Sequence, residues 1–251
     1  MFCPREHWLF AFPPKFITLN PTLDNFSNLL KASRSGSIPM SKYVFNSILI
    51  TGVSVVASIL FSTMAAFALS KMKFRGRSIM MQINQIALMF VPVAVMIPRY
   101  LIINKLGLID NYLAEILPLV AVPVALFLVK QFIDQVPNAL IEAAYIDGAG
   151  NWTIYCKIIL PMIKPAVATA AMLVFQQVWA NIETSNYYIN DDSLKSLAFY
   201  MNTLTSTTTT NTVAGQGIAA AASLIMFVPN LVLFIILQNS VMNTMANSGI
   251  K

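Results

Sequence analysis

Between Lys42 and Lys71 the chain carries no charged residue, and most side chains in this run are apolar or small. A helix rises about 1.5 Å per residue, so residues 43–70 are long enough to cross a hydrocarbon core of about 30 Å. Of the 251 residues, 57% are hydrophobic and 10% are charged, whereas soluble domains average about 25% charged. This composition excludes an ordinary water-soluble globule and a disordered chain. We therefore expect an all-α, polytopic membrane helix bundle.

Further apolar stretches predict additional membrane spans, because each has few or no charges over a length that suits a bilayer. In the third of these spans, Glu115 and Lys130 lie near the ends, where long side chains can reach the interface. Its prolines, Pro118 and Pro123, predict bending rather than a break. The five expected spans are residues 43–70, 78–98, 112–132, 165–182 and 217–239.

The basic residues indicate the orientation. The run 71–77 holds four basic residues and no acidic one, and burying them in lipid would cost on the order of 10 kcal/mol or more. Short loops rich in Lys and Arg stay in the cytoplasm. We therefore place this run and the connection 133–164 in the cytoplasm, and residues 183–216 outside. Residues 1–42 are then an extracytoplasmic segment and residues 241–251 a cytoplasmic tail.

An external N-terminus needs a signal for export, and residues 7–12 are too short and lack the basic flank and cleavage site of a signal peptide. Later spans can set the topology, but the simpler hypothesis is a further span that precedes Met1 and is missing from this chain. A reading frame without an apolar segment of about 20 residues upstream of Met1 would refute it.

Several classes of site find no support in the sequence. Cys3 and Cys156 fall on opposite sides of the membrane in this topology, so we expect no internal disulfide. His7 has no Cys or His partner at the spacing of metal ligands, and we expect no metal site and no cofactor. The chain has no nucleophile beside a base and no paired carboxylates, which disfavours an intramembrane enzyme and leaves no catalytic residue. The basic run lacks interleaved aromatic residues, which argues against nucleic acid.

The long cytoplasmic connection predicts two short helices. Asn138, after Pro137, is a candidate N-cap for the first, which ends at Asp147-Gly148 because glycine accepts the left-handed conformation. Asn151 is a candidate cap for the second, over residues 152–159, which Pro161 closes.

One face of the first helix is small and carries a single carboxylate. It consists of Ala139, Glu142, Ala143 and Ile146, at spacing i, i+3, i+4 and i+7. This face suits a groove on another protein, with Glu142 available to a basic partner. Periodicity alone allows equally well that the helix packs against its own bundle.

The connection resembles the EAA motif of ABC importer permeases. It has Glu-Ala-Ala, two residues, Asp-Gly-Ala, and nine residues from that Gly to Ile-x-Leu-Pro. The run 127–132, Pro13-Pro14, residues 22–26, Asn46-Ser47 and the C-terminal 248–251 are similar to the carbohydrate-uptake, maltose-type branch. The resemblance implies that the residues coupling the permease to an ATPase are Glu142, Ala143, Ala144, Asp147, Gly148, Ala149, Leu160 and Pro161.

The resemblance also implies a type I ABC importer permease fold in a bacterial plasma (inner) membrane, usually with six spans. The implied partners are a second related permease subunit, a cytoplasmic ABC ATPase dimer and an extracytoplasmic solute-binding protein. The chain has no Gly-x-x-x-x-Gly-Lys-Ser/Thr loop, so ATP must be handled by a partner. In this hypothesis Asp147-Gly148 is a fixed bend, Glu142 a polar contact and Ala143 the point of closest approach.

This chain departs from the family pattern near one span end. The family often has Trp-Asn followed by an acid, whereas here Trp179 is followed by Ala180-Asn181-Ile182-Glu183. The departure bears on which sugar is carried, because polar residues near that span end can face the passage.

Polar side chains inside the spans are candidates for a solute path, although amides also join neighbouring helices, at about 0.6 kcal/mol on average. Trp179 could stack on a sugar or anchor the span at the interface. These candidates are Asn84, Gln85, Gln176, Gln177 and Trp179.

Other functions remain open at this point. One is a permease of another ABC branch, for peptides, phosphate or polyamines, and another is a truncated fragment that does not transport. A secondary transporter is disfavoured because the span interiors show no ionisable residue for ion coupling.

Overall fold

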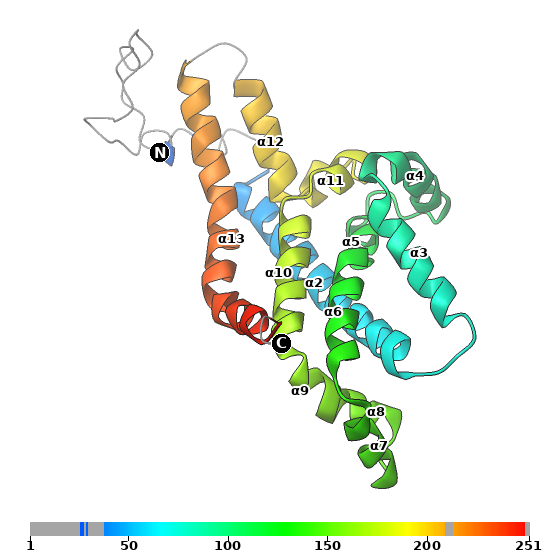
Figure 1. The fold of residues 1–251 in the computed structure, drawn as a ribbon. Coiled ribbons are helices and arrows are strands. Elements are labelled where there is room, and N and C mark those ends of the chain that lie inside the picture. Colours follow the sequence, from blue (N-terminus) through cyan, green and yellow to red (C-terminus); the bar gives the residue numbers. More distant parts are fainter. Residues whose placement is uncertain (1–25, 28, 30–37, 209–212, 249–251) are drawn as a thin grey trace.

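The computed structural model describes residues 26, 27, 29, 38–208 and 213–248. All regular structure within them is helical, which confirms the expected all-α fold (Figure 1). Most of segment 1–42, with Cys3 and His7, lies outside the described residues. In chain order the elements are α2 (Met40–Lys71), α3 (Arg77–Met89), η2 (Pro92–Val95), α4 (Met96–Lys105), α5 (Tyr112–Val120), α6 (Pro123–Gln135), α7 (Asn138–Ile146), α8 (Asn151–Ile154), the π-helical η3 (Tyr155–Ile159), α9 (Leu160–Met162), α10 (Lys164–Trp179), α11 (Glu183–Tyr188), η4 (Asp192–Leu194), α12 (Leu197–Thr208) and α13 (Val213–Ser248).

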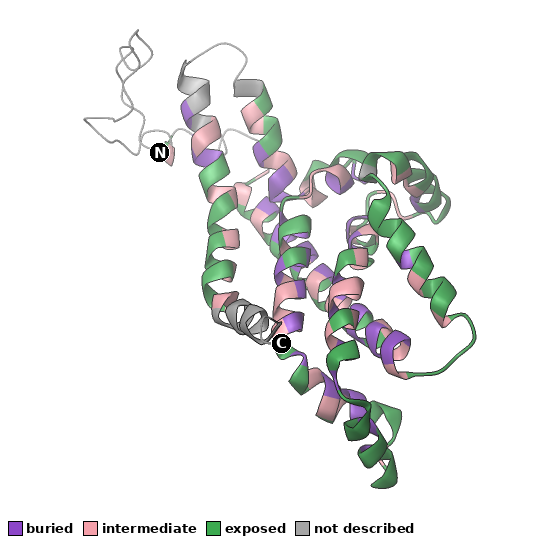
Figure 2. Ribbon diagram, viewed as in Figure 1, coloured by how far each residue is buried: buried purple, intermediate pink, exposed green. Residues whose placement is uncertain are grey.

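Helix α2 is the centre of the bundle and packs against α5, α6, α10 and α12. Its buried face carries small and polar side chains such as Ser54, Ser58 and Thr63, while Val56 and Phe61 are exposed (Figure 2). This is the reverse of a helix in a water-soluble protein, and it is typical of a helix surrounded by lipid. Small residues let neighbouring helices approach closely, and lipid covers the large apolar side chains.

Three helical stretches are long and apolar enough to cross a membrane, and two bent helix pairs raise the number to as many as five within the described residues. The three are Met40–Lys71, Tyr112–Gln135 and Ala219–Gln238. The last agrees with the expected span 217–239, although α13 begins earlier and continues to Ser248.

The expected span at 78–98 contains a sharp bend. Helix α3 ends at Met89, and the chain turns by 110° between Arg77–Met89 and Val93–Lys105. The residue before a proline is driven into extended geometry, and Val91, before Pro92, has φ −75° and ψ 130°. Proline therefore ends the helix here, well before Pro98.

The third expected span is interrupted rather than only bent. Pro118 lies inside α5, as expected, but α5 ends at Val120, and α6 begins at Pro123. Val122, the residue before that proline, has φ −105° and ψ 101°, which is extended geometry. The helix is thus broken over two residues before Pro123, contrary to the expectation, while α5 and α6 together still form one stretch long enough to cross a membrane.

Several fully buried alanines lie in the core between the helices. Ala125 on α6 has no exposed surface and belongs to the largest core cluster, which also includes Ala66 on α2 and Ala166 on α10. Its neighbour Val124 points outward and is 45% exposed.

We expect Ala125→Leu to destabilise the protein by about 1–3 kcal/mol, because the added carbons must enter a filled interface. Thermal unfolding of the detergent-purified chain measures this as a lower midpoint. Val124→Leu adds a larger aliphatic chain to the outer surface of the same helix and should leave the midpoint nearly unchanged. Equal midpoints for the two variants would show that the α6 interface is not closely packed.

Candidate coupling loop and solute path

The first loop helix ends as the sequence predicts. Gly148 has φ +78°, its N–H donates to the carbonyl of Tyr145 at 3.0 Å, and the N–H of Ala149 donates to the carbonyl of Ala144 at 2.9 Å. These bonds form a Schellman motif, which satisfies the last carbonyls of α7 and reverses the chain. The expected bend at Asp147-Gly148 is confirmed.

The two expected asparagine caps are wrong. Pro137 occupies the N-cap of α7 and Gly150 that of α8, and neither end has a side-chain cap bond. The asparagines lie one residue later; Asn138 joins the loop to α2, and Asn151 joins the two helices of the loop to each other. Asn138 Oδ1 accepts a hydrogen bond from Lys71 Nζ at 2.8 Å, and Asn151 Oδ1 accepts one from the Tyr145 hydroxyl.

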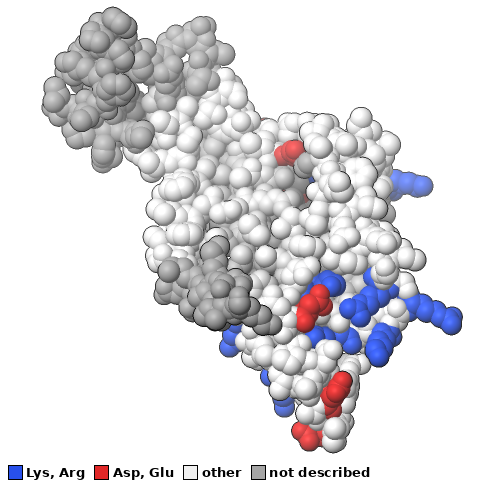
Figure 3. Space-filling view, in the orientation of Figure 1, with Lys and Arg blue, Asp and Glu red and all other residues white. Residues whose placement is uncertain are grey.

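The small face of α7 is open to solvent. Ala139, Glu142, Ala143 and Ile146 are all exposed, and Ile146 is 87% exposed. The helix packs on its bundle through the opposite side, where Ile141 and Ala144 are buried. Figure 3 shows acidic side chains at the tip of the molecule, below a group of basic ones. The small face is therefore free for another protein.

The residues implied by the EAA motif divide into two groups. Those on the outside of the loop are Glu142, Ala143, Asp147, Gly148 and Pro161. Ala144 is buried, and Ala149 and Leu160 are half-buried against the main core. The second group packs against the core, and the first is open to solvent.

The returning limb of the loop is bound to α2. The hydroxyls of Tyr155 and Thr63 lie 2.8 Å apart and are buried, and the Tyr155 ring contacts Phe67 at 5.6 Å between centroids. The limb is helical over Asn151–Met162, so it extends one residue past Pro161 before an 80° bend leads into α10. Sequence reasoning missed Tyr155, because its partners lie far away in the chain.

The outgoing limb is bound to the same helix. Lys71 Nζ, at the last residue of α2, donates to the carbonyl of Val136 at 2.6 Å, in addition to Asn138. Next to it the Ser70 hydroxyl donates to Asp134, which also pairs with Lys130 at 2.5 Å. Both limbs of the loop thus attach to the C-terminal half of α2.

The other end of α2 is fastened to the segment between α11 and α12. Asn46 Nδ2 donates to the carbonyls of Ser193 and Lys195 at 2.9 and 3.0 Å, and Asn46 Oδ1 accepts from the Tyr112 hydroxyl at 2.9 Å. The N–H of Leu197 donates to Ser47 Oγ at 2.7 Å. One helix therefore connects the coupling loop with the opposite end of the bundle.

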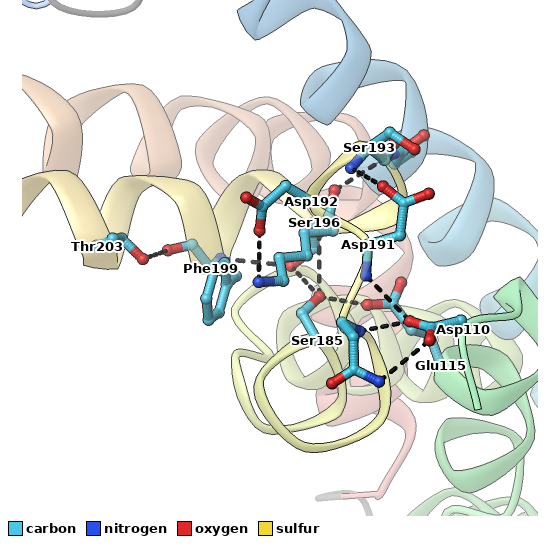
Figure 4. A network of polar contacts seen from close by, with 12 residues as sticks. Asp110, Glu115, Ser185, Asp191, Asp192, Ser193, Ser196, Phe199 and Thr203 are labelled. Atoms are coloured by element: carbon cyan, nitrogen blue, oxygen red, sulfur yellow. Dashed lines mark hydrogen bonds and ion pairs between the residues drawn. The ribbon is translucent and has the colours of Figure 1, made fainter. Parts of the chain in front are cut away.

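The place of Glu115 near a span end predicts that its side chain reaches the interface. In the structure the protein buries it instead. It is 1% exposed and accepts a hydrogen bond from Ser185, whose hydroxyl lies 2.9 Å from that of Ser196 (Figure 4). Residues that follow 70 positions later in the chain cover it. Glu115 lies in the first turn of α5 and so stays near the end of the expected span.

Asp110 holds the same external segment from the loop before α5. Its carboxylate accepts from the N–H groups of Asn190 and Asp191 and from the Asn190 amide at 3.1 Å (Figure 4). These hydrogen bonds, that of the Asn190 side chain first, lower the pKa of Asp110. They stabilise the segment above the ordinary carboxyl pKa and are lost as the pH falls through the lowered one.

The candidate solute-path residues do not converge. Asn84 on α3 is buried and donates to the carbonyl of Pro123 at 3.3 Å, so it joins two helices, while Gln85 is exposed. Gln176 and Gln177 are exposed on α10, which packs against α2, α6 and α13 rather than α3.

Trp179 is buried between α10 and α13. It is 7% exposed, its ring stacks on Phe175, and its Nε1 donates to the carbonyl of Met226 on α13 at 3.1 Å. It also lines a cavity of about 710 Å³ between α2, α10 and α13. Because that wall is almost wholly apolar, it offers sugar hydroxyls few partners.

Known proteins are similar to this chain in both sequence and fold. The family model for the binding-protein-dependent transport system inner membrane component matches residues 38–241. The arabinooligosaccharides transport system permease protein AraQ of Halalkalibacterium halodurans is 32% identical, over 82% of this chain and 72% of that protein. The probable ABC transporter permease protein YurM of Bacillus subtilis is 28% identical, over 84% and 70%.

Among solved structures, a bacterial ABC transporter involved in the import of the acidic polysaccharide alginate matches with a TM-score of 0.75. The match has 22% identity and covers 89% of this chain and 81% of that one, and it shows that the folds agree. The family model thus covers most of the chain, and the fold agrees with it. The chain belongs to the binding-protein-dependent transport system inner membrane components and is a membrane-spanning permease subunit of an ABC importer.

Proposed function

We propose that this permease imports a sugar or oligosaccharide together with a second permease subunit, a cytoplasmic ABC ATPase dimer and an external solute-binding protein. The observation that carries the proposal is the exposed, small face of α7 in the EAA loop. Relatives that are named for arabinooligosaccharides support the class of solute. Gln176, Gln177 and Gln85, which are exposed amides on apolar helices, are the path residues that we would test first.

In this proposal the loop docks into a cleft of the ATPase. The docking face is the exposed set Glu142, Ala143 and Ile146, with Asp147 at the bend. A large apolar side chain such as Ile146, held in the open, gains free energy when a partner removes it from water, at about 25 cal/mol per Å². Glu142 and Asp147 form no ion pair with the described residues, so their charges are available to basic groups of a partner.

Helix α2 then transmits the motion of the ATPase. It receives the loop through Tyr155 and Lys71, and it passes the movement to the external segment through Asn46. Taking a two-state equilibrium from 1:99 to 99:1 needs about 5.5 kcal/mol of differential interaction. A contact at the tip can deliver that only if the loop and α2 move as one body, and the bonds at both limbs provide this rigidity.

We expect Lys71→Met to lower solute uptake about tenfold or more, since two charge-assisted hydrogen bonds at the loop root, each worth about 1.5–3 kcal/mol, are lost. The measurement is uptake per ATP hydrolysed in reconstituted vesicles. Lys73→Met removes the same charge two residues away, at an exposed position outside the loop root, and should behave as the unmodified protein. Lys71→Arg should retain most of the coupling. A Lys73→Met defect as large as that of Lys71→Met would refute the role of Lys71.

Uptake of labelled solutes tests the solute class. Vesicles that contain the assembled importer are offered arabinooligosaccharides, a dipeptide, phosphate and a polyamine, each with the binding protein encoded nearest to the permease. We expect ATP-dependent accumulation of the oligosaccharide alone. Accumulation of the dipeptide, phosphate or polyamine instead would place the chain in another importer branch.

A further inference from the structure

A pocket lies where the cytoplasmic ends of α3 and α6 face each other. It has a volume of about 530 Å³ and is lined by Phe74, Gly76, Arg77, Ser78, Met81 and Lys130. Arg77 opens α3 and Lys130 belongs to α6, so the two cations reach the pocket from separate helices. Together with the Ser78 hydroxyl they form a donor set that suits phosphate oxygens.

The surroundings of the pocket are strongly cationic. Lys73 and Arg75 are exposed on the same loop, and among the described residues neither forms an ion pair. One carboxylate, that of Asp134, accompanies them and is already bonded to Lys130 and Ser70. Figure 3 shows the basic side chains gathered around a single acidic group, apart from the acids at the loop tip. A cluster of this kind attracts anions.

The position of the pocket relative to the expected spans indicates the source of the anion. Charge-free runs lie on both sides of the loop, at 43–70 and 78–98, so the pocket lies where the chain leaves the hydrocarbon. From there Ile79, Ile83 and Ile86 form an exposed apolar stripe along α3, at spacing i, i+4 and i+7. The stripe lies on the side of α3 away from Arg77 and Met81 and suits contact with lipid, so the pocket lies at the level of phospholipid headgroups.

We propose that this pocket binds the headgroup phosphate of an anionic phospholipid of the cytoplasmic leaflet. Arg77 and Lys130 contact the phosphate oxygens, and the Ser78 hydroxyl donates to one of them. The site does not depend on which solute is carried, and it is separate from the docking face of α7.

Native mass spectrometry of the purified full chain with phosphatidylglycerol tests the proposal. Arg77→Gln removes a pocket cation, and Arg75→Gln makes the same change two residues away, outside the pocket lining. We expect Arg77→Gln to reduce the retained phosphatidylglycerol about fivefold, which corresponds to the 1 kcal/mol or so that one cation contributes near an anionic surface. Arg75→Gln should retain it, as should the conservative Arg77→Lys.

Three results would overturn the proposal. Equal loss of lipid in both glutamine variants would show diffuse attraction without a site. Displacement of the retained lipid by millimolar inorganic phosphate would identify a free-phosphate site. Absence of the lipid from the importer assembled with its second permease subunit would show that protein covers the pocket. Normal thermal unfolding of Arg77→Gln, measured in parallel, excludes misfolding as the cause of lipid loss.

Discussion

Gly148→Val is expected to abolish uptake while the chain still folds and assembles with its partners. Gly148 has φ +78°, which a residue with a Cβ adopts only at a cost of about 1–2 kcal/mol, more for a β-branched side chain. The strain is relieved by opening the Schellman turn, so the two limbs of the loop no longer hold a fixed angle. ATP hydrolysis should then continue without moving α2. The measurement is the ratio of solute imported to ATP hydrolysed in vesicles.

Gly150→Val is the matched control for this substitution. Gly150 lies two residues away, has φ −76° and ψ 163°, and has open space where a Cβ would go, as Gly148 does. Valine adopts this extended geometry without strain. Gly150→Val should therefore import solute at close to the normal ratio. Normal coupling in Gly148→Val, with normal assembly, would contradict the fixed bend.

Ile146→Asp should prevent the ATPase from binding. Ile146 is 87% exposed and belongs to none of the core clusters, so the substitution should leave the fold intact. In the docked complex the carboxylate would be removed from water without a partner. Loss of a central apolar contact in an interface, of 2 kcal/mol or more, corresponds to an affinity at least about thirtyfold lower.

Ile146→Leu separates this effect from a general sensitivity of α7, because it keeps the apolar volume at the same position. Co-purification with the ATPase measures both variants, with the thermal midpoint of the permease as the test of folding. We expect Leu to retain the complex and Asp to lose it. An ATPase that stays bound to Ile146→Asp would show that this face of α7 is not the docking surface.

Local patterns were enough to predict several elements. Residues 43–70 predict α2 because no charge or proline interrupts them, and Gly148 predicts the end of α7 because few other residues adopt its conformation. The bend before Pro92 could have been anticipated from the same rule that limits the residue before a proline. The direction of the turn, in contrast, depends on how α4 packs.

Long-range contacts set the remaining features, and no local pattern reports them. Glu115 is buried by Ser185, which is 70 residues away, and Lys71 bonds Val136 at a separation of 65. The roles of polar residues in the spans are equally hard to predict from the sequence, since Asn84 contacts a neighbouring helix and Gln85 does not. The sequence shows that these side chains are polar residues within apolar spans. Only the packing of the helices decides whether they join helices or face a passage.

Co-purification of the chain with an ABC ATPase is the most direct test of coupling through the α7 loop. The permease is purified with its second subunit and each candidate ATPase, and ATP hydrolysis is measured with and without the binding protein and its sugar. We expect one ATPase to co-purify and its hydrolysis to rise when the loaded binding protein is added. Failure of every candidate ATPase to associate, with a correctly folded permease, would contradict the proposal that the α7 loop couples this permease to a motor.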